Sequence, residues 1–409
     1  MTDIADPAAT VRQALAGTPI IDGHNDLPAA LRARFGYSVE GLDKVKAELH
    51  TDLPRLRAGG VGAQFWSVYV SSALSEPEAV VSTLEQIDAV YRLAARYPDD
   101  LRIAYTAADV ETAFAEGRIA SLLGVEGGHS LAGSLGVLRA LARLGIRYVT
   151  LTHNDNTAWA DSATDVPGVD GLDDTGRAIV AELNRIGVLV DLSHTAESTQ
   201  RAALAASRAP VLFSHSSARA INDHPRNVSD AVLELLPTNG GVIQLTFVPA
   251  FVSPAVNEWS RELKAEKERL GLPVGWTWPR APRPGEDPAL VAEERAQAFA
   301  ASTDDRLPRW LERHPRPEAT AAQVADHVEH AREVAGLAHI GLGGDYDGVD
   351  RQPVDLADVS GYPVLLRELA SRGWSRSDLE ALTGRNVLRV LREAERLAVE
   401  PLWPTTPLR

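Results

Sequence analysis

Eight short apolar runs, each bounded by turn residues, are spaced along the 409-residue chain, and most are separated by segments with helical periodicity. Runs of this kind suit buried parallel strands. They occupy residues 19–26, 61–70, 118–128, 146–154, 187–194, 209–216, 240–247 and 339–348. Strands that alternate with helices indicate βαβ units, and a count of eight favours a closed (β/α)8 barrel over an open doubly wound sheet.

The segments between the runs support this fold class. Three of them, at residues 135–145, 175–187 and 319–336, are plausible crossover helices, and each ends in glycine, as helix C-termini often do. The first crossover does not open with GxGxxG, which disfavours a dinucleotide-binding sheet. Residues 363–399 are expected to form closing helices. We therefore predict a single (β/α)8 TIM barrel domain over residues 1–409.

One segment, residues 253–318, interrupts the regular spacing between the seventh and eighth predicted strands. It is rich in Pro, Trp and charged residues. Connections in compact domains are usually much shorter, so we predict a helical insertion in the barrel at this place. The insertion is either a lid over the site or a solvated element without a role in the chemistry.

Charge and composition narrow the partners and the metal ligands. The chain has 41 basic and 56 acidic residues, and this balance disfavours nucleic acid or an anionic membrane as a partner. It has no cysteine, so any metal ion must be held by histidine and carboxylate groups. The first residues lack an apolar stretch of signal-peptide length, and no run of about 18 apolar residues occurs. We expect a soluble cytoplasmic protein.

Polar residues end six of the eight apolar runs. Active sites of (β/α)8 barrels are built at the C-terminal ends of the strands, so such residues are candidates for a functional site. They are His24 with Asp26, Glu126, His153, His194, His215, and Asp345 with Asp347.

The spacing of these residues suggests a metal site. His24 and Asp26 are separated by one residue, so on a strand both would face the barrel mouth and could bind one ion. A single pair of this kind is as often only a solvated strand end. His194 and His215 could hold a second ion, and Glu126 could bridge the two. Two metal ions about 3.5 to 4 Å apart would share a hydroxide as the nucleophile.

Longer motifs run through nearly the whole chain: IDGHNDLP, GVEGGHSL, LTHNDNTAWADS, VDLSHT, FSHSSARAI, HPRNVSD, IGLGGDYDGV and RNVLRVL. In these motifs the sequence resembles the membrane (renal) dipeptidases, metallopeptidases of the amidohydrolase superfamily. The resemblance implies a zinc dipeptidase, often homodimeric, that cleaves L-Xaa-L-Xaa and L-Xaa-D-Xaa dipeptides. Mammalian members are secreted and lipid-anchored, whereas this chain lacks cysteine and a hydrophobic tail, so we expect a bacterial cytoplasmic member.

The resemblance also implies a set of two zinc ions and their ligands. His24 and Asp26 would bind one zinc ion, and His194 and His215 would bind the other. Glu126 would bridge both ions.

Three further residues would act on the substrate. The resemblance makes His153 the group that stabilises the oxygen of the tetrahedral intermediate, and Arg226 the group that binds the free carboxylate. A planar guanidinium suits such binding. Asp345 would take the proton from the bridging hydroxide and deliver it to the leaving amine. Asp347 is expected on the same strand face and is the second candidate for this role.

Other residues are expected to be structural. His327 and His330 share one face of a predicted helix, and a solvated face is a better explanation for them than a third metal site. His129 is expected to form a hydrogen bond in a loop. Trp66 and Tyr69 are expected to pack in the core.

Two alternatives to a dipeptidase remain. The first is another binuclear amidohydrolase of the same barrel class, acting on a lactone or a cyclic amide. Many of these enzymes bridge their metals with a carboxylated lysine, and none of the four lysines, at 44, 46, 264 and 267, lies near a predicted strand end. The second is a barrel that has lost catalysis and serves as a binding protein.

Overall fold

The computed structural model describes residues 6–272, 274 and 306–405. Its strands form one parallel sheet that closes on itself, because β2 pairs with β1 on one side and with β4 on the other. Around the barrel the strands are β1 (Ile20–Asn25), β2 (Val61–Tyr69), β4 (Ile119–Glu126), β5 (Ile146–Thr150), β6 (Leu189–Asp191), β7 (Leu212–Ser216), β8 (Val242–Leu245) and β9 (Ile340–Leu342). The predicted (β/α)8 barrel is confirmed, with all eight predicted strands present.

One further strand, β3 (Leu101–Ile103), was not predicted. Ala120 of β4 pairs with Ala63 of β2 and with Arg102 of β3, so β3 lies on the opposite edge of β4 from β2. β3 covers the start of β4, and β5 covers the rest of the same edge. A strand of three residues is too short to give a recognisable apolar run.

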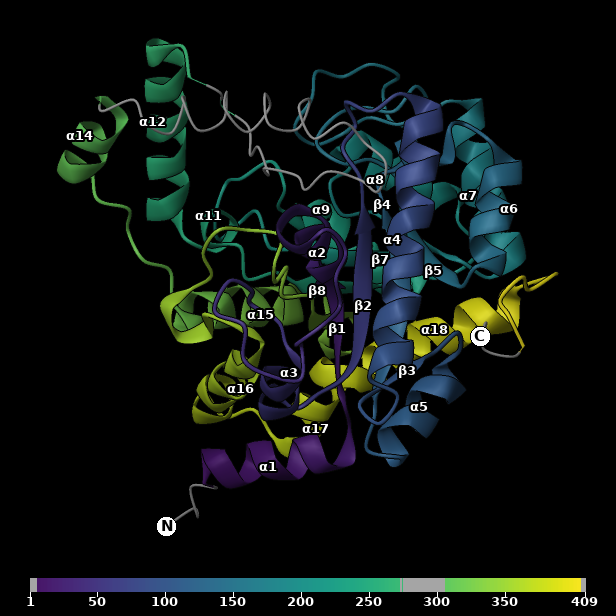
Figure 1. Cartoon of the computed structure of the whole chain (residues 1–409), viewed down its shortest axis with the longest axis horizontal. Coiled ribbons are helices and arrows are strands. Elements are labelled where there is room, and N and C mark those ends of the chain that lie inside the picture. Colours follow the sequence, from purple (N-terminus) through teal and green to yellow (C-terminus); the bar gives the residue numbers. More distant parts are fainter. Residues whose placement is uncertain (1–5, 273, 275–305, 406–409) are drawn as a thin grey trace.

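Helices surround the barrel and close one of its ends (Figure 1). They are α1 (Pro7–Gly17), α2 (Leu27–Phe35), α3 (Leu53–Gly59), α4 (Glu76–Arg96), α5 (Ala107–Ala115), α6 (Leu135–Arg143), α7 (Asp174–Ile186), α8 (Glu197–Ala206), α9 (Asp230–Leu233), α10 (Leu236–Asn239), α11 (Pro249–Val252), α12 (Pro254–Leu270), α14 (Arg306–Arg313), α15 (Ala321–Ala335), α16 (Tyr362–Ser371), α17 (Arg376–Glu380) and α18 (Asn386–Leu397). The predicted crossover helices are confirmed as α6, α7 and α15. The closing helices are confirmed as α16, α17 and α18.

Helix α7 illustrates how the sequence sets these elements. Its N-cap residue Asp173 accepts a hydrogen bond from the main-chain nitrogen of Gly176 at 2.9 Å, a contact that typically stabilises a helix by about 1 kcal/mol. The helix ends at Gly187, whose φ of 74° is left-handed and therefore favours glycine. Between these ends, Ile179 and Leu183 are fully buried and hold the helix to the barrel.

The barrel is filled by side chains from its own strands. Every residue of β4 is buried, as expected for a parallel strand covered on both faces. Val387 and Leu391 of α18 belong to the same buried cluster as Ile21 and Phe65, so α18 closes the barrel end where the strands begin. At the opposite end, where the strands finish, loops carry the polar residues predicted to form the site.

The predicted insertion, residues 253–318, falls partly on α12 and α14, and its residues 273 and 275–305 lie outside the described residues. Nε1 of Trp259 on α12 donates to the main-chain oxygen of His314 at 2.8 Å, which joins α12 to the end of α14. In Figure 1 both helices lie at the end of the molecule toward which β2 points.

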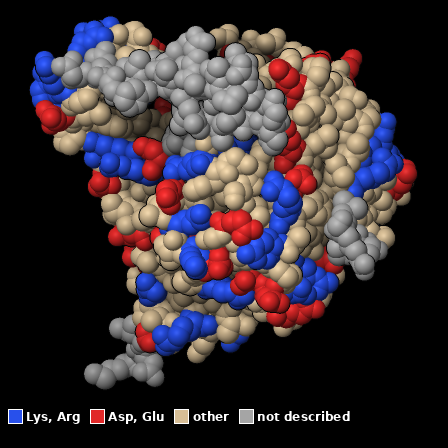
Figure 2. All heavy atoms as spheres, in the orientation of Figure 1, with Lys and Arg blue, Asp and Glu red and all other residues tan. Residues whose placement is uncertain are grey.

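Surface charges are mixed on the face drawn in Figure 2, where basic and acidic side chains alternate. Many of them form ion pairs; Arg372, for example, lies 2.7 Å from carboxylate oxygens of both Asp326 and Glu329. No helix in the described part of the chain is long and apolar enough to cross a membrane.

Candidate metal centre

Five side chains, carried at or just after the ends of four strands, converge at one end of the barrel. Nε2 of His24 lies 3.3 Å from Oδ2 of Asp26 and 3.4 Å from Oε2 of Glu126. Nε2 of His194 lies 3.0 Å from Oε1 of Glu126, and Nε2 of His215 lies 3.4 Å from the same oxygen. The structure therefore brings together all five residues that the sequence placed in a metal site.

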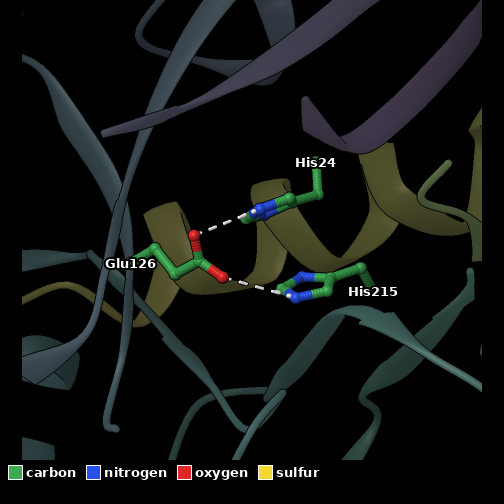
Figure 3. Close-up of side chains that lie close together, drawn as sticks. All are labelled: His24, Glu126 and His215. Carbon is green, nitrogen blue, oxygen red and sulfur yellow. Dashed lines mark ion pairs between the residues drawn. The ribbon is translucent and has the colours of Figure 1, made fainter. Parts of the chain in front are cut away.

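Glu126 occupies the middle of this cluster. Figure 3 shows its carboxylate between two histidine rings, with one oxygen directed at His24 and the other at His215. Oγ of Ser67, on β2, donates a hydrogen bond to Oε2 at 3.0 Å and so fixes the orientation of the carboxylate. Ser67 could not be identified from the sequence, because a serine inside a strand carries no motif of its own.

Asp26 reaches the cluster by a different route from the one predicted. β1 ends at Asn25, so Asp26 is the first residue after the strand and not part of it, although its carboxylate faces His24 at the barrel mouth as predicted. Asp26 is the N-cap residue of α2, but its side chain makes no capping hydrogen bond. Asn25 serves as the local cap instead, because its Oδ1 accepts from the main-chain nitrogen of Leu27 at 2.9 Å. The carboxylate of Asp26 is thereby free to face His24.

The chain conformation after the strands also differs from the prediction. β6 ends at Asp191 and β9 at Leu342, so His194 and Asp345 lie in loops and not at strand ends. Both residues are left-handed, with φ of 67° and 57°. Non-glycine residues rarely adopt this conformation, and those that do cluster at functional sites.

Burial and charge set the protonation of the cluster. Burial lowers the pKa of His194 and of His215 well below the usual range, and the positive charge of Arg226 adds to this effect. Burial also opposes protonation of His24, but Tyr148, Glu126 and Asp26 outweigh it and raise the pKa of His24. Two of the three histidines are therefore neutral, the form that binds metals.

The residues of the cluster fit a metal ion. The described residues offer no hydrogen-bond partner to three of its buried atoms, Nε2 of His24, Oδ1 of Asp26 and Nδ1 of His194. Nε2 of His194 and Nε2 of His215 are only 2.9 Å apart and can share at most one proton. A cation held between His24 and Asp26 would satisfy the first two of these atoms, and a set of histidine and carboxylate ligands without thiolates is one that zinc accepts.

Asp345 lies beside the cluster and Asp347 does not. Asp345 is within reach of a common ion with His24 and Asp26. Burial and the charge of Asp26 raise the pKa of Asp345 well above its usual range. Gly348 makes room for both carboxylates, since a Cβ there would lie 2.3 Å from an oxygen of each.

Asp347 instead faces His50, in the segment before α3. Its Oδ1 accepts from the main-chain nitrogen of His50 at 2.7 Å, and its own nitrogen donates to Nδ1 of His50 at 3.0 Å. The prediction that Asp345 and Asp347 share a strand face is wrong, because both follow β9 in left-handed conformations. The reciprocal contact with His50 anchors the loop that carries Asp345.

His153 lies at the mouth of the cluster. Its Nε2 is 3.9 Å from Oε1 of Glu126, and its ring centroid is 4.3 Å from that of His194. Burial lowers its pKa to about 4, so the ring is neutral at physiological pH. Tyr69 packs against it with ring centroids 4.5 Å apart. Tyr69 thus borders the site, contrary to prediction, whereas Trp66 packs in the core as predicted.

Arg226 is buried in the loop after β7, and among the described residues it has no carboxylate within ion-pair distance. Nη2 donates to the main-chain oxygen of His215 at 3.2 Å, and the guanidinium lies over the ring of Phe251. Nε has no partner in the described part of the chain. Burial lowers the pKa of Arg226 to about 10, so it remains a cation at neutral pH.

The remaining predicted residues are structural. His129 forms the predicted loop hydrogen bond, with Nε2 2.9 Å from the main-chain oxygen of Val70. His327 is fully buried, and the prediction of a solvated helix face is wrong for it. Its Nδ1 accepts from the nitrogen of Ala218, and its Nε2 lies 3.1 Å from the oxygen of Val252. His330, half-buried on the same helix, pairs with an aspartate of α9.

Comparison with known proteins identifies the family. The family model "Membrane dipeptidase (Peptidase family M19)" matches residues 8–403. Dipeptidase verJ of Clonostachys rogersoniana is 38% identical, over 98% of this chain and 90% of that protein. Dipeptidase aclJ of Aspergillus oryzae is 39% identical, over 97% of this chain and 83% of that protein. Both relatives are fungal, and the expected bacterial origin stays a prediction.

Solved structures share the fold. The probable dipeptidase PvdM from Pseudomonas aeruginosa is 25% identical with a TM-score of 0.80, over 96% of this chain and 99% of that chain. A metallopeptidase from Rhodobacter sphaeroides, liganded with a phosphinate mimic of L-Ala-D-Ala, is 22% identical with a TM-score of 0.73, over 92% of this chain and 99% of that chain. Since the family match spans nearly the whole sequence, the chain belongs to the membrane dipeptidase family, peptidase family M19, and is a metallo-dipeptidase.

Proposed function

We propose that the protein is a binuclear zinc dipeptidase that hydrolyses L-Xaa-L-Xaa and L-Xaa-D-Xaa dipeptides. The observation that carries the proposal is the position of Glu126, whose two carboxylate oxygens face histidines from opposite sides of the barrel mouth. A carboxylate in this position suits a bridge between two ions.

The metal ligands are assigned from the contacts of the cluster. His24 and Asp26 would hold one zinc ion, and His194 and His215 would hold the other, with Glu126 shared. When bound, zinc supplies Lewis acidity toward the peptide carbonyl and lowers the pKa of water.

Arg226 would bind the C-terminal carboxylate of the substrate. A buried guanidinium without an acidic partner among the described residues is costly, and a carboxylate that arrives with the substrate would compensate it. The planar guanidinium can bind both oxygens of a carboxylate. Because Arg226 contacts the main chain of His215, the carboxylate would be held at a fixed separation from the ligand cluster. This separation would limit substrates to two residues.

Two other residues would act on the peptide bond itself. Asp345 has a raised pKa and lies beside Asp26, so it can accept a proton from the attacking water and donate it to the leaving amine. The neutral ring of His153, at the mouth, can donate a hydrogen bond to the carbonyl oxygen as negative charge develops there. Tolerance of a D-residue at the second position is proposed from the resemblance to the family.

A lactonase or a cyclic amidase is the alternative. Many such barrels use a carboxylated lysine as the bridge between their metal ions. In this chain the residue proposed for the bridge is Glu126. The four lysines lie on the segment between α2 and α3 and on α12, with Lys44 and Lys264 exposed. The position of the lysines favours the dipeptidase.

Metal analysis tests the proposal. Protein dialysed against a chelator and reloaded with zinc is expected to hold two zinc ions per chain and to hydrolyse L-Ala-L-Ala, and the chelated protein is expected to be inactive. Retention of activity after complete metal removal would contradict the proposal. So would activity that needs only one zinc ion per chain.

We further propose that the protein is a cytoplasmic homodimer, with residues 253–318 as an insertion in a single barrel domain. The dimer is supported by the resemblance to the family. Sedimentation of the zinc-loaded protein at micromolar concentration tests it, because a monomer would sediment with the 44.0 kDa mass of one chain.

A further inference from the structure

Two histidines of the metal centre contact a side-chain hydroxyl through their second ring nitrogen. Nδ1 of His24 lies 3.0 Å from Oη of Tyr148, and Nδ1 of His215 lies 2.8 Å from Oγ of Ser214. Both hydroxyl residues are fully buried. A hydroxyl has a single proton to donate, so the direction in which that proton points decides which atom of each pair is the donor.

The proton of Ser214 points to Asp191. Oγ of Ser214 lies 2.6 Å from Oδ2 of Asp191, which also accepts from Oγ1 of Thr150 at 2.5 Å. The other oxygen of Asp191 accepts from the main-chain nitrogens of Ser193 and Ser214. Burial raises the pKa of Asp191, but these four donors favour its carboxylate, which can only accept. Oγ of Ser214 must therefore accept from Nδ1–H of His215.

The proton of Tyr148 points to a main-chain carbonyl. Oη lies 3.3 Å from the oxygen of Gly23, which can only accept, so Oη is free to accept from Nδ1–H of His24. A phenol is protonated at neutral pH, since its ordinary pKa is about 10. The ring fits inside the barrel only because residue 124 is glycine, where a Cβ would lie 2.0 Å from Cζ of Tyr148.

Both contacts therefore place a proton on Nδ1. When either ring is neutral, as a metal ligand must be, its lone pair lies on Nε2, the atom that faces the shared carboxylate of Glu126. We propose that Tyr148 is a positioning residue that holds His24 in the Nδ1–H tautomer for metal binding. Ser214, supported by Asp191, does the same for His215. The inference rests on the proposed function, which makes these histidines zinc ligands.

His194 differs from His24 and His215 in the surroundings of its Nδ1. Its Nδ1 is buried and has no hydrogen-bond partner among the described residues. Its tautomer is therefore not set by a hydroxyl, and the two hydroxyl contacts are specific to the other two rings. Hydrogen bonds from the second ring nitrogen are a general means of orienting histidine ligands, and their loss typically lowers metal affinity by about 10- to 100-fold.

The tautomers can be observed directly by nitrogen-15 NMR of the histidines in the zinc-loaded protein. For His24 and His215 we expect protonated Nδ1 and zinc-bound Nε2, with the resonances assigned through the loss of one ring signal in each of His24→Ala and His215→Ala. A proton on Nε2, or zinc on Nδ1, of either ring would overturn the inference for that ring.

Zinc affinity, measured by competition with a chromophoric chelator, tests the roles of the hydroxyls. Tyr148→Phe and Ser214→Ala are each expected to weaken the affinity of one zinc site by about 10- to 100-fold. Tyr97→Phe is the matched control, since it removes a buried hydroxyl that donates to the main-chain oxygen of Val39. It is expected to bind zinc as the wild type does. Unfolding midpoints of the metal-free variants show whether each is folded.

Asp191→Asn separates tautomer control from simple packing. The amide keeps the shape of the carboxylate but can donate to Ser214, which frees the serine proton to point at His215. We expect lower zinc affinity at one site, together with a changed nitrogen-15 pattern of His215 only. Wild-type affinity and an unchanged pattern would contradict the role of Asp191.

The ligand variants distinguish failure of this inference from failure of the proposed function. If His24→Ala and His215→Ala bind two zinc ions with wild-type affinity, the proposed metal centre is wrong. If these variants lose zinc while Tyr148→Phe and Ser214→Ala retain wild-type affinity, the dipeptidase proposal stands and the positioning inference is wrong.

Discussion

Nη2 of Arg226 donates a hydrogen bond to the main-chain oxygen of His215 at 3.2 Å. One residue is the proposed anchor for the substrate carboxylate and the other is a proposed metal ligand. This contact would therefore set the distance between the C-terminal carboxylate and the peptide bond of a bound dipeptide. Nη1 of Arg226 also lies 3.5 Å from Oγ of Ser216, the last residue of β7. Arg226 is therefore held by hydrogen bonds to β7, the strand that also carries His215.

Replacement of Arg226 is expected to weaken substrate binding more than turnover. Arg226→Lys keeps the charge but loses the planar guanidinium, so KM should rise by about 10- to 100-fold, the range of a hydrogen bond to a charged group, with kcat changed much less. Steady-state kinetics on L-Ala-L-Ala measure both constants. The matched control is Arg219→Lys, which alters a partly exposed arginine of the same loop. A lower kcat at unchanged KM would contradict the anchoring role.

Asp345→Asn is expected to keep both zinc ions and to lower kcat by about 100- to 10,000-fold, because an amide cannot accept and return a proton. Asp347→Asn makes the same change two residues away, and its Oδ1 can still accept from the nitrogen of His50. We expect this control to retain kcat within a few-fold. Zinc content is measured alongside the kinetics, and near-normal turnover of Asp345→Asn would remove the residue from the mechanism.

Glu126→Gln should lose the bridge between the two metal sites. The amide has only one oxygen ligand, while the carboxylate of Glu126 presents one oxygen to His24 and the other to His215. We expect at most one tightly bound zinc ion. Loss of a hydrogen-bond partner of a metal ligand typically lowers metal affinity by up to about 100-fold, so loss of a ligand itself should lower the affinity for the second ion by more than this. Zinc content after gel filtration checks this. Two retained ions would disprove a bridging role.

His327 makes the stability of the protein depend on pH. Burial lowers its pKa to about 4, whereas the unfolded side chain titrates near 6.5. Between these values the unfolded state binds a proton that the folded state does not, so stability is full above about pH 6.5 and falls as the pH decreases toward 4. The loss attributable to His327 is at most about 3 kcal/mol.

Urea unfolding at neutral and mildly acidic pH measures this effect. His327→Gln removes the titrating group and can still accept from Ala218 and donate to Val252, so its stability is expected to fall less than that of the wild type on acidification. His330→Gln changes a histidine on the same helix and serves as the control. Equal losses for His327→Gln and the wild type would show that His327 does not contribute.

The strands of the barrel could be predicted from the sequence because each is a buried apolar run between turns, from residues 19–26 to residues 339–348. The strand ends were harder to predict. The apolar pattern does not mark the point at which the chain turns, and Asp26, His194 and Asp345 lie beyond the last residue of their strands. The residues of the site were found nonetheless, because polar groups after a buried run are visible in the sequence.

Contacts between distant residues could not be predicted. His50 bonds to Asp347 across 297 positions of the chain, and Tyr148 contacts His24 across 124. The helical spacing of His327 and His330 fits a solvated face as well as a buried one. Only the packing of α15 against the barrel decided that His327 is buried.

The most direct test of the account is amino-acid release by the zinc-loaded protein from L-L, L-D and D-L dipeptides, with N-acetylated and C-amidated forms as controls. The account predicts release from L-L and L-D dipeptides and none from the amidated forms, because Arg226 requires a free carboxylate. Cleavage of lactones or cyclic amides, with no dipeptide cut, would contradict the proposed function.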